Sequence, residues 1–312
     1  MKLSVIVPCY NEEKAVNKFY DAAKPVFDKL NIDYEIIFIN DGSQDRTSLL
    51  LAEIAANDKK IKIIEFSRNF GQTPAILCGL KYATGDCAVE MDCDLQDPVE
   101  VVPLMIKKWK EGYEVVHGRR TSRKGESIFK RATASLYYKF LSKISDTKIP
   151  RNTGEFKLID RKVIDIILLL PEHDKYLRGL ESWVGFKQTF VDFERKKRVG
   201  GKTHYSLKKM LCLAKAGIVS NSTYPLKISL RFGLVTIFLS LVCFIVFVVF
   251  ACIGKALPLI SWIFPTISIF FGLSFVFNYI TNLYIGRINE ETKSRPEYII
   301  AKKINVGEKD ND

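Results

Sequence analysis

Residues 87–98 read Cys-Ala-Val-Glu-Met-Asp-Cys-Asp-Leu-Gln-Asp-Pro, an apolar run that ends in a cluster of aspartates. The run Cys87–Asp92 has the length and composition of a buried β-strand. Residues two apart in an extended segment project to the same side, so Asp92 and Asp94 would face one point beyond the strand. Two carboxylates placed in this way can bind a hard divalent cation such as Mg²⁺ or Mn²⁺.

A competing interpretation of these aspartates is an acidic turn that begins the next helix. Asp97 precedes Pro98, and this order is typical of a helix N-cap followed by proline at the first helical position. We therefore assign the capping role to Asp97 and the metal-binding role to Asp92 and Asp94.

Other β-rich runs lie along the first half of the chain, with helix-like stretches between them. The predicted strands are Lys2–Pro8, Tyr34–Asn40, Ile61–Ser67, Cys87–Asp92 and, more weakly, Glu114–Gly118. The predicted helices are Glu13–Leu30, Arg46–Asn57, Thr73–Ala83 and Val99–Glu111. This alternation predicts an α/β fold, a mostly parallel sheet with helices on both faces.

Each of the first four predicted strands is followed by a polar turn. The turns are Pro8–Glu13, Asn40–Ser43, Ser67–Gly71 and Asp92–Pro98. Right-handed crossovers bring the carboxyl ends of parallel strands to one edge, where α/β sheets bind their ligands, so the four turns predict a single site. Neither G-x-G-x-x-G nor a P-loop motif occurs, which disfavours dinucleotide and P-loop folds. For Asp41, hydrogen bonding to a nucleoside and starting the next helix both stay open.

Past Gly118 the alternation weakens. A helix over Lys130–Lys143, a strand over Gly154–Ile159, a helix over Arg161–Leu170 and a strand over Lys187–Arg195 are predicted. These elements complete a domain that we place at residues 1–205. Residues 206–230 carry an amphipathic pattern with lysines off the apolar face, which is typical of a helix that lies along a lipid surface.

Two uncharged stretches follow, and each is long enough to cross a hydrocarbon core of about 30 Å as a helix. We predict transmembrane helices near 232–254 and 261–284, which together form a hairpin over residues 231–286. Basic residues flank the pair, whereas the tip carries only Lys255, so the domain and the tail 287–312 would face the cytoplasm. The chain is thus expected to be a multi-pass protein of the cell membrane.

The net charge of +12 also permits a nucleic-acid partner. The basic residues concentrate in two blocks, Arg119–Arg131 and Arg195–Lys209, and neither shows the regular interleaving of aromatic residues that a single-strand platform uses. With a membrane hairpin downstream, anionic lipid and phosphate are better partners, and we expect no nucleic acid.

The four polar turns resemble motifs of the family 2 glycosyltransferases of the GT-A fold. The resemblance is nearest to the polyprenyl-phosphate (bactoprenol) glucosyltransferase branch, which is related to dolichol-phosphate mannose synthases. It extends over essentially the whole chain through Arg161–Val163, Arg178–Leu180, Trp183–Gly185, Tyr284–Arg287 and Arg295–Pro296. It implies inverting, metal-dependent transfer of a sugar, glucose first, from a UDP-sugar to polyprenyl (undecaprenyl) phosphate at the cytoplasmic face. A homotetramer and a flippase partner are further implications.

The resemblance also assigns roles to individual residues. Those expected to bind the nucleotide sugar are Pro8, Tyr10, Glu12, Asp41, Asp92, Gln96 and Arg119. The metal ligands would be Asp92, Asp94 and Gln96, and the lipid phosphate would meet Arg131, Arg198 and Lys202. The catalytic set would be Asp94, Glu155 and Arg131.

Glu155 departs from the pattern, because relatives commonly show T-G-D-F where this chain has Thr153-Gly-Glu-Phe156. A phosphate acceptor, with a second pKa of about 6, is already largely ionised near pH 7 and needs little help from a base. We therefore expect Glu155 to position groups or to act as a weak base.

Three other functions remain open. A processive polysaccharide synthase would carry a Q-x-x-R-W motif and more membrane helices, whereas this chain has Arg178-Gly-Leu-Glu-Ser-Trp183 and two predicted spans. A GDP-mannose-using enzyme of the dolichol-phosphate mannose synthase type would differ in its donor. A catalytically inactive membrane scaffold would keep the fold alone.

Overall fold

The computed structural model describes residues 1–121, 153–172, 175–194 and 260–307, with isolated positions between 235 and 253. These residues form two compact units. One holds the described residues up to 194 together with those from 295 onward, and the other holds those between 235 and 294. The last strand of the chain therefore belongs to the same unit as the first.

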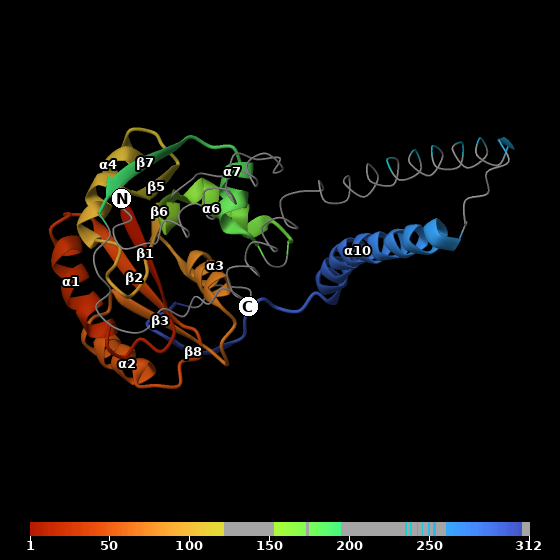
Figure 1. The fold of residues 1–312 in the computed structure, drawn as a ribbon. Coiled ribbons are helices and arrows are strands. Elements are labelled where there is room, and N and C mark those ends of the chain that lie inside the picture. The colour runs from red at the N-terminus through yellow and green to blue at the C-terminus, as the bar shows by residue number, and fades with distance from the viewer. Residues whose placement is uncertain are drawn as a thin grey trace. The chain divides into compact units, whose positions relative to one another are not determined.

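The first unit is built on a single eight-stranded sheet with the order β7-β5-β6-β4-β1-β2-β3-β8 (Figure 1). Its strands are β1 Lys2–Cys9, β2 Asp33–Asn40, β3 Ile61–Phe66, β4 Cys87–Glu90, β5 Val115–Arg120, β6 Thr153–Asp160, β7 Gln188–Phe193 and β8 Ile300–Ile304. Its helices are α1 Val16–Asp28, α2 Thr47–Asn57, α3 Gln72–Tyr82, α4 Val102–Lys110, α6 Arg161–Leu169 and α7 Leu177–Trp183, with a 3-10 turn, η1, at Val99–Val101.

The predicted α/β fold with a mostly parallel sheet is confirmed. Strand β1 pairs in parallel with β2 and β4, and β2 pairs in parallel with β3. Each of the five strands and four helices predicted for the first half is present, with ends shifted by a few residues. The second half adds antiparallel pairs, because β6 runs against both β4 and β5. Parallel pairing brings the carboxyl ends of β1 to β4 to one edge, as expected.

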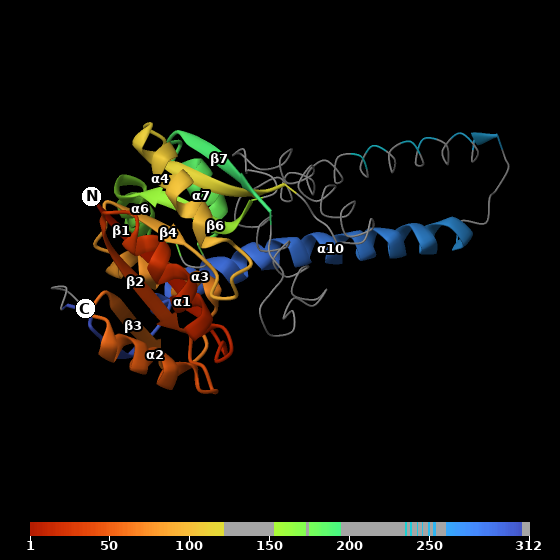
Figure 2. The same cartoon turned by 90° about the vertical axis from the view of Figure 1, so that its left-hand side faces the viewer.

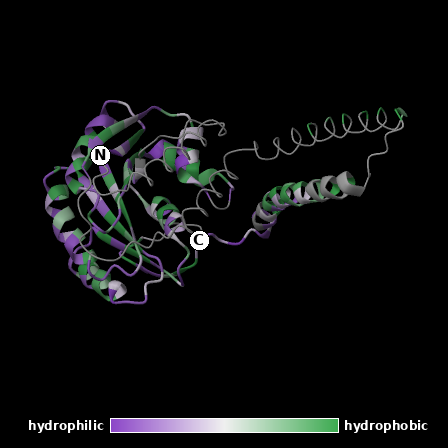
Figure 3. Cartoon of the chain, in the orientation of Figure 1, coloured by the Kyte–Doolittle hydropathy of each residue, from purple (hydrophilic) through white to green (hydrophobic). Residues whose placement is uncertain are grey.

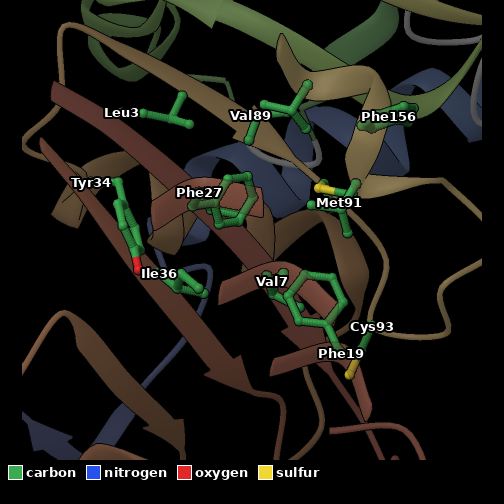
Figure 4. Close-up of a cluster of buried hydrophobic side chains, with 14 of the residues drawn as sticks. Leu3, Val7, Phe19, Phe27, Tyr34, Ile36, Val89, Met91, Cys93 and Phe156 are labelled. Carbon is green, nitrogen blue, oxygen red and sulfur yellow. The ribbon is translucent and has the colours of Figure 1, made fainter. Parts of the chain in front are cut away.

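Each face of the sheet is covered by helices (Figure 2). Each face also has an apolar core of its own. Figure 4 shows the core that contains Val7, Phe19, Phe27 and Val89. Helix α1 enters this core because its buried residues recur three or four positions apart, which places them on one helical face. Burying one large apolar side chain contributes about 1.5–3 kcal/mol, so these cores provide the rigid base for the loops at the sheet edge.

Two local features differ from the sequence-based expectations. Helix α4 begins at Val102 after η1, and neither has a side-chain cap, so the capping role assigned to Asp97 is wrong. Asp97 is instead buried, with its Oδ1 3.6 Å from Nη2 of Arg120. Strand β8 was not predicted, and it pairs antiparallel with β3 at the edge of the sheet.

The second unit contains α10, a helix of 34 residues over Ile260–Lys293 that includes the predicted span 261–284. Figure 3 shows hydrophobic colours along much of α10. Its exposed large apolar side chains are Ile263, Ile267, Phe271, Phe275, Val276, Tyr279, Ile285 and Ile288. Among the residues that the structure describes, no helix combines the length and the apolarity needed to cross a membrane. The predicted helix at 206–230 and most of the span at 232–254 lie outside the described residues.

A buried carboxylate joins the amino-terminal ends of the strands, away from the polar turns. Glu35 of β2 accepts hydrogen bonds from Ser4 Oγ at 2.6 Å and from the Thr84 backbone N–H at 2.7 Å. Lys62 Nζ lies 2.6 Å from the same carboxylate. Burial alone would raise the pKa of Glu35, but these partners outweigh it and lower the pKa to about 2.

We expect Glu35→Gln to destabilise the protein at pH 7, by on the order of 3 kcal/mol from the size of the pKa shift. Because the folded-state pKa lies below the unfolded value, the stabilisation is present above about pH 4.3 and is lost as the pH falls toward 2. Melting curves of the wild type and the variant should therefore converge between pH 5 and pH 2.5. A melting difference that stays constant over this range would contradict the assignment.

Candidate active site

The polar turns after β1 and β2 are joined by direct hydrogen bonds. The backbone N–H of Asn11 donates to Ser43 Oγ at 3.0 Å, and Asn11 Oδ1 accepts from the Gln44 N–H at 2.8 Å. The Asp41 N–H donates to the Cys9 carbonyl at 2.9 Å, which continues the β1–β2 pairing into the turns. The predicted meeting of these two turns at one edge is confirmed.

Asp41 fastens the turn after β2 to the loop after β3. Its carboxylate accepts hydrogen bonds from the backbone N–H groups of Phe70 at 2.7 Å and Gly71 at 2.9 Å. Burial raises the pKa of Asp41, and these two N–H groups oppose the rise. Helix α2 begins after Arg46 without a side-chain cap, so the helix-starting interpretation of Asp41 is wrong.

The same junction requires glycine at position 42. Gly42 has φ +65°, and a Cβ built there would lie 2.4 Å from the carbonyl carbon of Arg68. No real Cβ contact is that short, so any other residue would push the two loops apart. The close approach of the backbones is what allows the Asp41 carboxylate to reach the N–H groups of the second loop.

Asp92 and Asp94 lie in the turn that follows β4. Gln72 Nε2, at the start of α3, donates to Asp92 Oδ1 at 2.9 Å, which links this turn to the loop after β3. The Gln96 N–H donates to Asp94 Oδ1 at 3.0 Å, and Leu95 between them has a left-handed φ of +57°. Asp94 is buried and Asp92 is half-buried. The left-handed backbone at Leu95 is locally strained, and it belongs to the turn that carries both carboxylates.

The electrostatics of this turn fit a divalent cation. Burial, followed by the charges of Asp97, Asp94 and Glu155, raises the pKa of Asp92 to about 7. A bound cation would relieve this crowding of negative charge. Within the described part of the chain no three acidic, histidine or cysteine side chains converge as metal ligands. Mg²⁺ commonly binds through one or two carboxylates while water and substrate phosphates complete its shell, so Asp92 and Asp94 suit this kind of site.

Two adjacent arginines of β5 point in opposite directions. Arg119 forms an exposed two-point contact with Asp192 of β7, with Nε–Oδ1 at 2.6 Å and Nη2–Oδ2 at 2.9 Å. Arg120 is the arginine that faces the acidic turn, where it approaches Asp97 and lowers the pKa of Asp92. Its buried Nε has no hydrogen-bond partner among the described residues. The family resemblance assigns a nucleotide-sugar role to Arg119, whereas Arg120, on the opposite face of the strand, is the arginine beside the acidic turn.

Glu155 of β6 is held by two cations. Arg178 Nη2 lies 2.7 Å from Glu155 Oε1, and Lys157 Nζ lies 3.2 Å from Glu155 Oε2. Burial would raise the pKa of Glu155, but Arg178 and Lys157 outweigh it and lower the pKa to about 2. A carboxylate this acidic is a poor proton acceptor, so the geometry favours the positioning role over the weak-base role.

The glycine of the Thr153–Phe156 motif lies against the Arg120 side chain. A Cβ built on Gly154 would lie 2.9 Å from Nη2 of Arg120. The missing side chain therefore leaves room for the arginine that faces the acidic turn.

The remaining predicted site residues divide into two groups. Pro8 lies half-buried one residue before the end of β1, Tyr10 is exposed in the next turn, and the Glu12 N–H donates to Thr47 Oγ1 at 2.9 Å. These three flank the same sheet edge as Asp41. Arg131, Arg198 and Lys202 lie outside the described residues, so their phosphate-binding roles stay predictions.

Comparison with known proteins agrees with the arrangement of the polar edge. Residues 4–168 match the family model "Glycosyl transferase family 2". The chain belongs to this family. The family resemblance read from the polar turns is thereby confirmed, and the protein is a glycosyltransferase.

Relatives align over nearly the whole chain. The protein named "Uncharacterized glycosyltransferase YkcC" of Bacillus subtilis (strain 168) is 44% identical over 99% of this chain and 96% of its own length. The "Prophage bactoprenol glucosyl transferase homolog" of Escherichia coli (strain K12) is 38% identical over 97% of this chain and 99% of its own length. Glucosyl-3-phosphoglycerate synthase from Mycobacterium tuberculosis, solved with Mn²⁺, UDP-glucose and phosphoglyceric acid, aligns at 20% identity over 70% of this chain and 77% of that one, with a TM-score of 0.47.

We expect Arg120→Leu to lower kcat/KM for sugar transfer by about 10- to 100-fold, which corresponds to one lost charge-assisted contact. The same substitution at Arg119 should cost less, since Asp192 already holds that guanidinium. Steady-state assays of both full-length variants, with melting curves to verify folding, provide the comparison. A larger loss at Arg119 than at Arg120 would support the role that the resemblance implies for Arg119 and contradict the one expected for Arg120.

Proposed function

We propose that this glycosyltransferase moves glucose from UDP-glucose to polyprenyl (undecaprenyl) phosphate at the cytoplasmic face of the membrane. The observation that carries the proposal is the pairing of the Asp92–Asp94 turn with Arg120 at the edge where the polar turns meet. A site for a diphosphate needs a cation held by carboxylates and a further positive group nearby. The full-length similarity to proteins named bactoprenol glucosyl transferases supports glucose as the sugar and a polyprenyl phosphate as the acceptor.

The donor would be held by the parallel half of the sheet. Asp41 fixes the loops on which a nucleoside would rest, with Pro8, Tyr10 and Glu12 in the adjoining turn. Asp92 and Asp94, with Gln96 beside them, would bind Mg²⁺ or Mn²⁺, which neutralises the charge of the departing nucleoside diphosphate. The partly exposed guanidinium of Arg120, which faces the same turn, would bind a phosphate oxygen.

The acceptor would approach from the antiparallel half. A lipid phosphate oxygen attacks the anomeric carbon in one displacement, which inverts the configuration and releases the nucleoside diphosphate. Because the phosphate arrives largely ionised, no strong base is needed, in agreement with the low pKa of Glu155. Glu155 would orient Arg178 beside the acceptor, and Arg131, Arg198 and Lys202 would complete its phosphate site. Positioning and electrostatics would thus supply most of the rate.

Strand β8 limits the possible membrane topologies. Because β8 pairs with β3, residues 1–121 and 300–304 belong to one folded sheet and lie on the same side of any membrane. The chain between β7 and β8 must then cross an even number of times. Two uncharged stretches lie in this interval, and the second coincides with α10, whose large apolar side chains are exposed. These observations support a two-span hairpin with the catalytic domain and β8 on the same side of the membrane.

The central experiment is transfer of radiolabelled sugar by the purified full-length protein in detergent with undecaprenyl phosphate. We expect labelled lipid from UDP-glucose with Mn²⁺ or Mg²⁺, and none after EDTA. We expect Asp94→Ala to abolish transfer because it removes a carboxylate from the diphosphate site. Asp165→Ala, an exposed aspartate of α6, is the matched control and should transfer normally.

The donor panel also tests the alternatives. Label from GDP-mannose in place of UDP-glucose would indicate an enzyme of the dolichol-phosphate mannose synthase type, and long glycan chains would indicate a processive synthase. No product from UDP-glucose, UDP-N-acetylglucosamine, UDP-galactose or GDP-mannose would favour the inactive scaffold, provided that the protein is shown to be folded. The homotetramer and the flippase partner stay predictions that this assay does not address.

The topology is tested by alkaline phosphatase fusions expressed in a Gram-negative host. A fusion after Lys255 should be active, since the enzyme works only outside the cytoplasm, whereas a fusion after Lys293 should be inactive. The even number of crossings is the physical reason for this contrast. Inactivity of both fusions would indicate a chain that does not cross the membrane.

A further inference from the structure

One face of the sheet buries apolar side chains and also a group of charged and polar ones. Under α3, strands β1 to β3 present Ile6, Ile37 and Ile64, which pack in an apolar core. On the other half of the sheet, buried polar side chains of three neighbouring strands lie close together: Glu90 of β4, His117 of β5 and Lys157 of β6. This polar layer is separate from the Glu35 cluster with Ser4 and Lys62, which lies on the same face at the amino-terminal ends of β1 to β3.

Lys157 is the centre of this layer. Its side chain is 0% exposed, and its Nζ lies 3.4 Å from Glu90 Oε2 and 3.2 Å from Glu155 Oε2. The same ammonium also contacts Glu181 of α7. One buried cation thus joins two strands of the sheet to the helix that covers them.

Lys157 and Arg178 are the cations of this layer, because His117 is neutral near pH 7. Burial lowers the pKa of His117 to about 4, so its ring is neutral near pH 7. Its Nε2 lies 2.9 Å from Gln188 Oε1, and Gln188 Nε2 donates to the Glu181 carbonyl at 2.9 Å. Strand β7 therefore also holds α7 in place, through neutral hydrogen bonds.

The partners of Lys157 are close in the chain, or bonded, to residues of the proposed site. Glu90 is two residues before Asp92 along β4 and its turn. Glu155 shares the face of Lys157 on β6 because the two are two residues apart. Arg178 is one helical turn before Glu181 on α7 and binds Glu155 through Nε at 2.9 Å. A shift of Lys157 would therefore displace Glu155 and Arg178 relative to the acidic turn.

Stability alone does not explain such a cluster. Desolvating buried ions costs about as much as their attraction returns, and apolar residues of similar volume often serve the fold equally well. What a buried ion pair does supply is a defined geometry, since each carboxylate is held at a fixed distance and direction. The main effect of the Lys157 cluster is thus to fix the positions of β4, β6 and α7 relative to one another.

We propose that Lys157 is a positioning residue for sugar transfer, which fixes Glu155 and the Arg178-bearing helix α7 relative to the Asp92–Asp94 turn. This inference rests on the proposed function, because the placed groups are those assigned to the acceptor side. Lys157 itself is completely buried and acts through its neighbours. Its loss should affect the transfer step while donor binding, which depends on the loops held by Asp41, persists.

The experiment compares Lys157→Met with Lys62→Met in the full-length protein in detergent. Both lysines contact a buried carboxylate, but Lys62 binds Glu35 at the opposite end of the strands. Three quantities are measured for each: the melting temperature, the dissociation constant for UDP, and kcat with KM for undecaprenyl phosphate. Lys157→Arg, which keeps the charge, is measured in parallel.

We expect Lys157→Met to lower kcat by about 30-fold, the scale of a small misplacement of reacting groups, with UDP affinity within about threefold of wild type. Lys157→Arg should recover a large part of kcat. Lys62→Met should lower the melting temperature and leave kcat unchanged. If Lys157→Met behaves like Lys62→Met, with a lower melting temperature and normal kcat, Lys157 is structural and the inference is wrong.

A second variant decides the matter if Lys157→Met does not fold. Glu181→Leu removes the contact from the α7 side while Lys157 keeps Glu90 and Glu155 as partners, so the buried charge stays paired. We expect a kcat loss of about tenfold with unchanged UDP affinity, and normal kcat would overturn the inference. An inactive wild type would instead count against the proposed function itself.

Discussion

The hydrogen bonds from the backbone N–H groups of Phe70 and Gly71 to the Asp41 carboxylate are the contact on which the polar edge depends. They hold the loop after β3 against the turn after β2, at a separation that only glycine at position 42 permits. Gly71 is followed by Gln72, whose amide binds Asp92. A short path of hydrogen bonds therefore connects the loops to which we assign the nucleoside with the acidic turn. Without the Asp41 carboxylate, the loop after β3 would lose these two hydrogen bonds to the turn after β2.

The two halves of the site treat carboxylates in opposite ways. Asp92 lies among other acids, and burial together with their charges raises its pKa to about 7. Glu155 lies between Arg178 and Lys157, and its pKa falls to about 2 in spite of burial. Environments that drive titratable groups apart in this way distinguish their chemical roles. The first is the carboxylate that we propose binds a cation from solution, whereas the second is already paired with cations of the chain.

Much of the fold could be predicted because, in the first half of the chain, short apolar runs typical of strands alternate with helix-like stretches. Apolar runs such as 61–67 read as strands, and turn residues after them read as ligand-binding loops. Three features could not be found in this way. Strand β8 is short and carries Lys302 and Lys303, so its sequence resembles a polar tail. Only its antiparallel pairing with the edge strand β3 identifies it as a strand. Lys157 reads as a solvated strand residue, because the carboxylates that bury it come from positions 90 and 181. Nothing in the sequence shows which of Arg119 and Arg120 faces the acidic turn. The pairing of β5 with β7 decides this, because it places Arg119 opposite Asp192.

Strand β8 also has a consequence for synthesis of the chain. The outer edge of β3 is complete by residue 66, yet its partner at 300–304 leaves the ribosome only after α10 has been made. During that interval the β3 edge carries unpaired backbone groups, and such edges pair readily with other chains. The nascent protein is thus most vulnerable to aggregation before its last residues emerge. Truncation at the carboxyl terminus would make that vulnerable state permanent.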